Sequence, residues 1–307
     1  MEETILIFGH KNPDTDSIMS SLVMADLETT KYGNVIACRL GEINKETQYA
    51  LDYFKVEAPQ LIHEVEENQE VILVDHNEFS QSVNGIEKAK IMKVVDHHRI
   101  SNFQTSEPLF YMGEPVGCTC TILFELYMMN HMEITPTIAG LMLSAIISDT
   151  LLLKSPTTTI KDEKAVEVLA GIAGVDPNVY GLDMLKAGTD LSDYTAEQLI
   201  NLDAKKVDIH GNSVVVAQVN TVDISDVMKK QKAIEEAMNK VINEEKVDLF
   251  MTVITDIVNS NSQTIALGNR VDMVENSYHV KLENNTAFLP GIVSRKKQIL
   301  PVLQENA

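Results

Sequence analysis

The 307-residue sequence contains no tryptophan, and aromatic residues of all kinds make up only 5% of it. Basic residues are scarce as well: 25 lysines and arginines stand against 45 aspartates and glutamates, which gives a net charge of −20. A surface field of this sign repels nucleic acids and anionic membranes, so we expect neither as a partner. A local basic pocket for a small anion remains compatible with this charge balance.

Long apolar runs are also absent. No uncharged apolar stretch approaches the roughly 20 residues of a membrane-spanning helix, and the first residues lack the basic and apolar regions of a signal peptide. Cysteine is rare, and the odd count of three (Cys38, Cys118 and Cys120) fits reduced thiols in the cytoplasm. Cys118 and Cys120 could form a metal or redox pair, but such cysteines are more often small buried residues. We therefore expect a cytoplasmic protein with unpaired thiols.

The sequence does contain enough hydrophobic residues, 44%, for a full core, and its length suffices for two domains. Apolar runs typical of strands occupy residues 4–8, 34–40, 70–75 and 89–95. Patterns typical of helices occupy residues 44–54, 120–130 and 137–147. This alternation predicts an α/β fold with a parallel sheet covered on both faces.

The second part of the chain follows a short polar stretch. Residues 179–187 read as a last helix of the first domain, and residues 188–193 carry the glycine and small polar residues of a linker. Beyond it we expect a helix from Thr195 toward Lys205, strands or hairpins over 207–219, 247–257 and 263–267, and a long charged helix over 225–245. These patterns predict domains over residues 1–188 and 194–307 joined by a hinge at 189–193, the second being a smaller, mixed α/β domain.

The stretch from Gly9 to Ser17, GHKNPDTDS, joins the first strand to the first helix. Its proline stops the strand, and Asp16 or Ser17 can cap the helix that follows. The turn carries one imidazole, His10, and two carboxylates, Asp14 and Asp16. Alone, this is compatible either with an ordinary polar turn or with a site for a divalent metal.

Three later apolar segments end in similar groups. Asp75 follows one strand, Asp96, His97 and His98 follow another, and Asp149 follows a helical segment. Because the carboxyl ends of parallel strands lie along one edge of a sheet, these side chains should converge. So many carboxylates need cations between them, and their number favours two metals about 4 Å apart. Imidazole with carboxylate suits manganese, cobalt, iron or zinc, whereas magnesium prefers oxygen alone.

A dense basic cluster, SRKKQ, lies near the C-terminus at Ser294–Gln298. Lysines in such a cluster are usually solvated surface residues. An anionic substrate at the metal edge would give them another role, because arginine grips two phosphate oxygens in a planar fork and lysine supplies a movable charge.

Five motifs together resemble the family II, manganese-dependent inorganic pyrophosphatases of the DHH phosphoesterase superfamily: GHKNPDTDS (9–17), DHNE (75–78), DHH (96–98), SDT (148–150) and SRKKQ (294–298). They follow the family's order and span nearly the whole chain. The resemblance implies hydrolysis of pyrophosphate to two phosphates by a water activated between two Mn²⁺ ions per subunit, which Co²⁺ or Mg²⁺ can replace or supplement. It also implies a homodimer, and an N-terminal parallel-sheet DHH domain whose active site lies in the cleft to the C-terminal domain.

The resemblance further implies six metal ligands: His10 and Asp14 for one ion, Asp16, His97 and Asp149 for the other, and Asp75 bridging both. Asp75 and His98 would be the catalytic residues, with His98 facing the substrate. The substrate would also contact three basic residues of the second domain: Lys205, Arg295 and Lys296. The motif around Lys205 is short, so that Lys206 could be mistaken for it.

Other functions share these metal ligands. An exopolyphosphatase would use similar chemistry on a longer chain. A DHH phosphodiesterase for oligonucleotides or cyclic dinucleotides would have a glycine-rich motif in its second domain, and the sequence has no Gly-Gly pair. A metal-dependent binding protein without catalysis would not need the full set of metal ligands and phosphate-binding residues.

Overall fold

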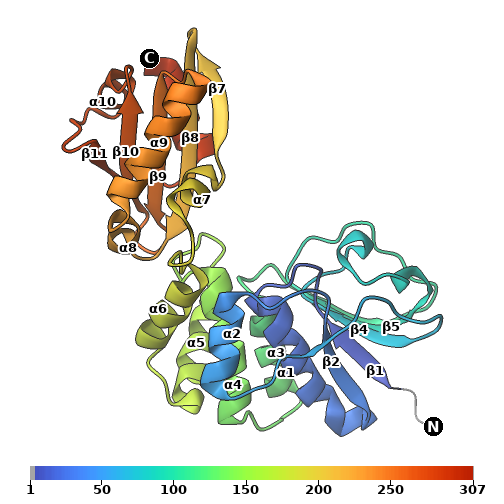
Figure 1. The fold of residues 1–307 in the computed structure, drawn as a ribbon. Coiled ribbons are helices and arrows are strands. Elements are labelled where there is room, and N and C mark those ends of the chain that lie inside the picture. Colours follow the sequence, from blue (N-terminus) through green and yellow to red (C-terminus); the bar gives the residue numbers. More distant parts are fainter. Residues whose placement is uncertain (1–3, 307) are drawn as a thin grey trace. The chain divides into compact units, whose positions relative to one another are not determined.

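The structure is a computed structural model that describes residues 4–306. The chain divides between Gly188 and Thr189 into two compact units, both drawn in Figure 1. The hinge expected at residues 189–193 directly follows this division and stays a prediction.

The first unit contains a six-stranded, entirely parallel sheet with the order β3-β2-β1-β4-β5-β6. This confirms the α/β class that the alternating pattern predicts. Its strands are β1 (Ile5–Phe8), β2 (Val35–Arg39), β3 (Gln60–Leu61), β4 (Glu70–Val74), β5 (Lys90–Asp96) and β6 (Phe110–Gly113). Its α-helices are α1 (Thr15–Tyr32), α2 (Lys45–Phe54), α3 (Thr119–Met129), α4 (Pro136–Thr150), α5 (Ile160–Ala173) and α6 (Pro177–Gly188).

The long helices of this unit lie on one face of the sheet (Figure 1). The largest core joins Ile7, Ile72 and Val95 of that face to residues of α1, α3, α4 and α5. The other face, with Phe8, Leu73 and other strand residues, is covered by loops and two short 3₁₀ turns, η1 (Phe79–Gln81) and η2 (Ile86–Lys88). The sheet is therefore covered on both faces, but by α-helices on one face only.

The strand order explains this difference. From β1 the chain passes to β2 and β3 on one side, then crosses back to β4, β5 and β6 on the other. Because connections between parallel strands are right-handed, reversing the direction of winding moves the connections to the opposite face. Among the described residues, the connections that follow β4 and β5 contain no α-helix. These connections cover the second face of the sheet.

Helix α1 begins earlier than the sequence suggests. Asp14 is its N-cap and accepts a hydrogen bond of 3.0 Å from the backbone N–H of Ser17. The expectation that Asp16 or Ser17 caps this helix is therefore wrong. Because Asp14 takes the capping position and accepts from the N–H of Ser17, the helix starts at Thr15. Asp16 therefore lies inside the first turn, where its side chain is fully buried.

Asp162, at the start of α5, fixes the segment that leads into α3. Its buried carboxylate accepts hydrogen bonds from the backbone N–H of Gly117, the hydroxyl of Thr121, and both the backbone N–H and hydroxyl of Thr159. A side chain at Gly117 would approach Asp162 Oδ2 to 2.9 Å, so only glycine allows this contact. Asp162 thereby joins two helix starts that are separated by about forty residues in the chain.

The second unit is built on a mixed five-stranded sheet with the order β11-β10-β9-β8-β7, in which only β8 and β9 are parallel. Its strands are β7 (Lys205–Ile209), β8 (Asn212–Thr221), β9 (Leu249–Asp256), β10 (Asn261–Gly268) and β11 (Thr286–Pro290). Its helices are α7 (Ala196–Asn201), α8 (Ile224–Met228), α9 (Gln231–Glu245), α10 (Asp272–Tyr278), a π-helical turn η3 (Arg295–Ile299) and α11 (Leu300–Asn306).

A separate hydrophobic core lies on each face of this second sheet. One core contains residues of α7, α8 and α9, and the other contains residues of α10, η3 and α11. The single long helix expected over 225–245 is broken into α8 and α9, because Lys230 leaves the helical conformation there and donates its ammonium to the carbonyls of Leu191, Ser192 and Tyr194. Within residues 4–306, no helix has both the length and the apolar character to cross a membrane.

We expect Asp162→Ala to lower the free energy of unfolding by roughly 3 kcal/mol, because it leaves several buried donors without an acceptor. Urea unfolding followed by circular dichroism would measure this loss. Glu163→Ala is the matched control, since Glu163 is the next residue of the same helix turn and is exposed. An equal, small effect of both substitutions would contradict the anchoring role of Asp162.

Candidate metal centre

The acidic and imidazole side chains gather at the carboxyl ends of β1 and β4, where the order of the strands reverses direction. Ligands of open α/β sheets bind at such a point because the connecting loops diverge there to opposite faces. Asp75 follows β4 directly and has a left-handed backbone with φ of 58°. This conformation is tolerated by aspartate but uncommon outside glycine, and such strain is concentrated at functional sites.

One group of possible ligands consists of His10, Asp14 and Asp75. The Nδ1 atom of His10 lies 2.7 Å from the carbonyl oxygen of Lys11. Its Nε2 atom lies 3.4 Å from Asp14 Oδ2 and 3.3 Å from Asp75 Oδ2. A backbone carbonyl thus holds one ring nitrogen and leaves the other toward the carboxylates, which is the usual arrangement of metal-binding histidines.

A second group consists of Asp16, His97 and Asp149, with one ligand atom from each lying within 4.8 Å of the others. His97 repeats the pattern of His10: its Nδ1 lies 3.0 Å from the carbonyl oxygen of Val116. Its Nε2 lies 3.5 Å from Asp75 Oδ1 and 3.8 Å from Asp149 Oδ2. Asp149 sits in the last turn of α4, where the helix dipole disfavours a negative charge, so its placement has no benefit for the helix itself.

Asp75 lies between the two groups, with one oxygen toward each. Oδ2 faces His10, whereas Oδ1 faces His97. Oδ2 is buried and has no hydrogen-bond partner among the described residues. A buried carboxylate oxygen is costly unless a positive group lies beside it, and the Nε2 atom of His10 is the group that approaches it, at 3.3 Å. The donor set therefore fits two divalent ions that share Asp75.

The pKa values of these groups reflect their crowding. Burial lowers the pKa of His10 and of His97, but the adjacent carboxylates outweigh it and raise these pKa values to about 11 and about 9. Burial and the charge of Asp75 raise the pKa of Asp16 to about 6, and burial with neighbouring charges raises that of Asp149 well above its ordinary range. Because metals bind neutral imidazole and ionised carboxylate, a metal ion would compete with protons at these groups.

Asp96 has a different role from the other aspartates at the strand ends. Although the sequence places it beside His97 and His98, it occurs in none of the ligand groups found among residues 4–306. Its buried carboxylate accepts hydrogen bonds from the backbone N–H and Nδ1 of His98, both at 2.9 Å, and from the amide of Asn77 at 2.6 Å. Asp96 therefore orients the half-exposed ring of His98 by holding its Nδ1 atom.

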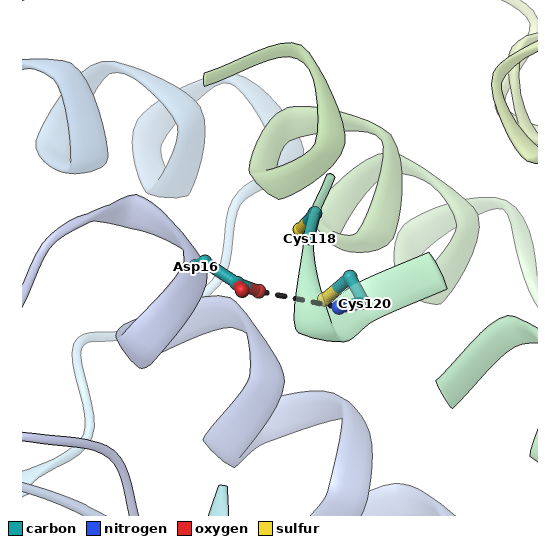
Figure 2. Close-up of side chains that lie close together, drawn as sticks. All are labelled: Asp16, Cys118 and Cys120. Carbon is teal, nitrogen blue, oxygen red and sulfur yellow. Dashed lines mark hydrogen bonds between the residues drawn. The ribbon is translucent and has the colours of Figure 1, made fainter. Parts of the chain in front are cut away.

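Two further groups occur among the described residues, and one of them adds His98 to Asp75 and His97. The other combines Asp16 with Cys118 and Cys120, and Figure 2 shows how they face one another. The Asp16 carboxylate already accepts three hydrogen bonds there, from the backbone N–H groups of Thr119 and Cys120 and from the hydroxyl of Ser20. Burial raises the pKa of both thiols, which disfavours the thiolate that a metal needs. The expectation of buried, unpaired cysteines is confirmed.

Three residues of the site carry no signal in the sequence. Thr119 donates its hydroxyl to Asp75 Oδ1 at 3.1 Å. Glu46 accepts a hydrogen bond of 2.8 Å from Thr15 and another, short one from Ser148, so that it links the turn of Asp14 to that of Asp149.

Arg99 lines a cavity of about 250 Å³ beside the cluster. The other residues that line this cavity are His10, Asp75, His76, Asn77, Glu78, Gln81 and His98.

The basic residues expected to bind substrate lie in the second unit. The Arg295 guanidinium donates to Asp203 through Nη2 at 2.8 Å, whereas its Nε and Nη1 are buried without a hydrogen-bond partner among the described residues. Lys205 pairs with Val216 of β8, whose side chain belongs to the core that contains η3 and α11. Lys206 points to the other face, where it forms an ion pair of 2.9 Å with Glu245 of α9. Lys205 and Arg295 thus share a face of the second sheet.

Comparisons with known proteins cover both units. The DHH family N-terminal domain matches residues 4–146, and the DHHA2 domain matches residues 182–306. The chain is 56% identical over 304 residues to the manganese-dependent inorganic pyrophosphatase of Bacillus subtilis, covering 99% of this chain and 98% of the relative. It is 57% identical over 305 residues to a probable manganese-dependent inorganic pyrophosphatase of Brevibacillus brevis, covering 99% and 98% of the two chains.

A solved structure resembles the chain over its whole length. The putative family II inorganic pyrophosphatase of Methanococcus jannaschii is 39% identical to it and has a TM-score of 0.64, covering 98% of this chain and 99% of the other. Because identity of this level extends over both units, the chain belongs to the family of manganese-dependent, family II inorganic pyrophosphatases.

Proposed function

We propose that the protein is a manganese-dependent hydrolase that cleaves inorganic pyrophosphate into two phosphates. One observation carries this proposal: Asp75 lies between two groups of ligands, with one oxygen toward each, in a chain that is similar over its whole length to manganese-dependent pyrophosphatases. Cobalt or magnesium can replace or supplement manganese, because both accept carboxylate oxygens.

The six ligands divide between two ions. His10 and Asp14 would hold one Mn²⁺, and Asp16, His97 and Asp149 would hold the other, with Asp75 shared by both. When bound, two such ions supply Lewis acidity and make a water molecule acidic near neutral pH. The protein contributes the fixed geometry, since backbone carbonyls hold His10 and His97, and α1 fixes Asp14 as its cap.

His98 is proposed to act on the leaving phosphate. Asp96 holds its Nδ1 and stabilises the protonated ring, so that Nε2 can donate a hydrogen bond or a proton to a phosphate oxygen. This hydrogen bond raises the pKa of His98, despite the opposing effect of burial. A proton delivered to that oxygen lowers the negative charge that builds up when the P–O bond breaks.

Arg295, Lys205 and Lys296 are proposed to bind the remaining phosphate oxygens. Two nitrogens of the Arg295 guanidinium are buried without a partner among the described residues, as expected for donors that an anion would satisfy. Lys205 lies on the same sheet face, whereas Lys206 is occupied by Glu245 on the other. This separation supports Lys205 rather than its neighbour as the phosphate-binding lysine.

We also propose that the protein works in the cytoplasm as a homodimer and binds neither nucleic acid nor membrane. The free buried cysteines and the net charge of −20 support the compartment and the lack of polyanionic partners. The homodimer is supported by the resemblance to family II pyrophosphatases.

Removal of metal by a chelator should abolish phosphate release from pyrophosphate, because the negatively charged carboxylate cluster then repels the substrate and no Lewis acid activates water. Manganese or cobalt should restore activity best when added back in a colorimetric phosphate assay. Tripolyphosphate and a cyclic dinucleotide, run in parallel, distinguish the other DHH activities. Fast cleavage of either of these with none of pyrophosphate would reject the proposed substrate.

We expect Asp75→Asn to reduce manganese affinity by about 100-fold or more and to remove nearly all turnover, because an amide cannot supply two anionic oxygens. Equilibrium dialysis and a phosphate assay measure the two effects. Asp52→Asn is the matched control on the surface of α2. Normal manganese binding by Asp75→Asn would contradict the shared position.

Lys296→Ala should raise KM for pyrophosphate by about 10- to 100-fold, since a charge-assisted contact is lost, while the manganese content stays the same. Lys297→Ala provides the comparison, because Lys297 is the adjacent lysine of the same helical turn. Steady-state kinetics with metal analysis would test both. If the two variants lose affinity equally, the effect belongs to the basic cluster as a whole and not to Lys296.

A further inference from the structure

Thr119 contacts two of the proposed metal ligands at once. It is the first residue of α3 and is fully buried. Its backbone N–H donates to Asp16 Oδ2 at 2.7 Å, and its hydroxyl donates to Asp75 Oδ1 at 3.1 Å. One residue of α3 thereby joins a carboxylate from the first turn of α1 to one that follows β4.

The contact with Asp75 selects an orientation of its carboxylate. Rotation about the last bond of an aspartate side chain is broad and roughly two-fold, so its own geometry does not fix where the oxygens point. The Thr119 hydroxyl engages Oδ1, the oxygen on the side of His97, and Oδ2 is left toward His10. With Oδ1 held in this way, one oxygen is presented to each ligand group.

The contact with Asp16 depends on the backbone alone. Figure 2 shows the start of α3 beside Asp16, with the hydrogen bond from the backbone N–H of Cys120 to its carboxylate, which is 3.3 Å long. Both this donor and the N–H of Thr119 belong to the backbone, so they remain after any side-chain substitution at position 119 that leaves the helix in place. A change of the hydroxyl therefore tests the orientation of Asp75 separately from the support of Asp16.

We propose that Thr119 is a positioning residue, whose hydroxyl orients the Asp75 carboxylate so that it can serve two metal ions. This inference rests on the proposed two-metal function of the site. It assigns Thr119 no contact with substrate. Residues that orient metal ligands in this way contribute about 10- to 100-fold to metal affinity in other proteins.

The test compares manganese affinity in four full-length variants with the wild type. Thr119→Val keeps the branched shape and removes the hydroxyl, Thr119→Ala removes it without the branch, and Thr119→Ser restores it. Tyr127→Phe is the matched control, because it removes another buried hydroxyl of α3, one that donates to Asp26 at 2.6 Å and touches none of the proposed ligands. Electron paramagnetic resonance of free Mn²⁺ gives each dissociation constant without relying on activity.

We expect the dissociation constant for Mn²⁺ to rise by about 10-fold or more in Thr119→Val and Thr119→Ala. Thr119→Ser should stay within about 3-fold of the wild type, and Tyr127→Phe should leave it unchanged. Thermal unfolding after chelation should change no more in Thr119→Val than in Tyr127→Phe, since the role concerns ligand orientation.

Three results would overturn the inference: unchanged Mn²⁺ affinity in Thr119→Val and Thr119→Ala, an equal loss in Thr119→Ser, or an equal loss in Tyr127→Phe. Failure of both Thr119→Val and Thr119→Ala to fold, with Thr119→Ser folded, would also overturn it, because it would assign the hydroxyl a structural role. Failure of the proposed function is a separate outcome, in which the wild type neither retains Mn²⁺ nor cleaves pyrophosphate.

Discussion

The structure of the site depends on holding four carboxylates together against their mutual repulsion. Asp14, Asp16, Asp75 and Asp149 approach one another in a largely buried setting, where charges interact more strongly than in water. Asp14 and Asp16 are held by backbone N–H groups at the starts of helices α1 and α3, where the positive ends of the helix dipoles favour a carboxylate. Only Asp149 lies at the unfavourable end of a helix, and burial and the other aspartates raise its pKa accordingly.

The topology of the sheet explains why this crowding occurs at one place. Strand β1 leads into α1 on one face, whereas the connections that follow β4 and β5 lie on the other. The turns after β1 and β4 therefore diverge and leave room between them, and their first residues carry His10 and Asp75. Helices α3 and α4 then bring Thr119 and Asp149 to the same edge from the helical side. The edge thus receives ligands from both the sheet and the helices that cover it.

The sequence brings out the candidate ligands because each follows a strand or an apolar helix, and the structure places these side chains close together. Their role as metal ligands stays a prediction. The sequence does not predict Thr119 or Glu46, since their partners lie 44 and 102 residues away and their neighbours in the sequence show nothing unusual. The resemblance assigns Lys205 rather than Lys206, but the short local motif does not separate them, and it is the register of β7 against β8 that puts their side chains on opposite faces. Asp96 differs from Asp75 for a similar reason: both lie at the ends of strands, but Asn77 and His98 occupy the oxygens of Asp96.

The overall charge of the chain opposes the binding of an anion. A protein with a net charge of −20 repels pyrophosphate, and the four clustered aspartates add to this repulsion at the site itself. Two divalent ions would together balance the charge of the four carboxylates. With the proposed function, bound metal therefore converts an edge that repels an anion into one that can accept it.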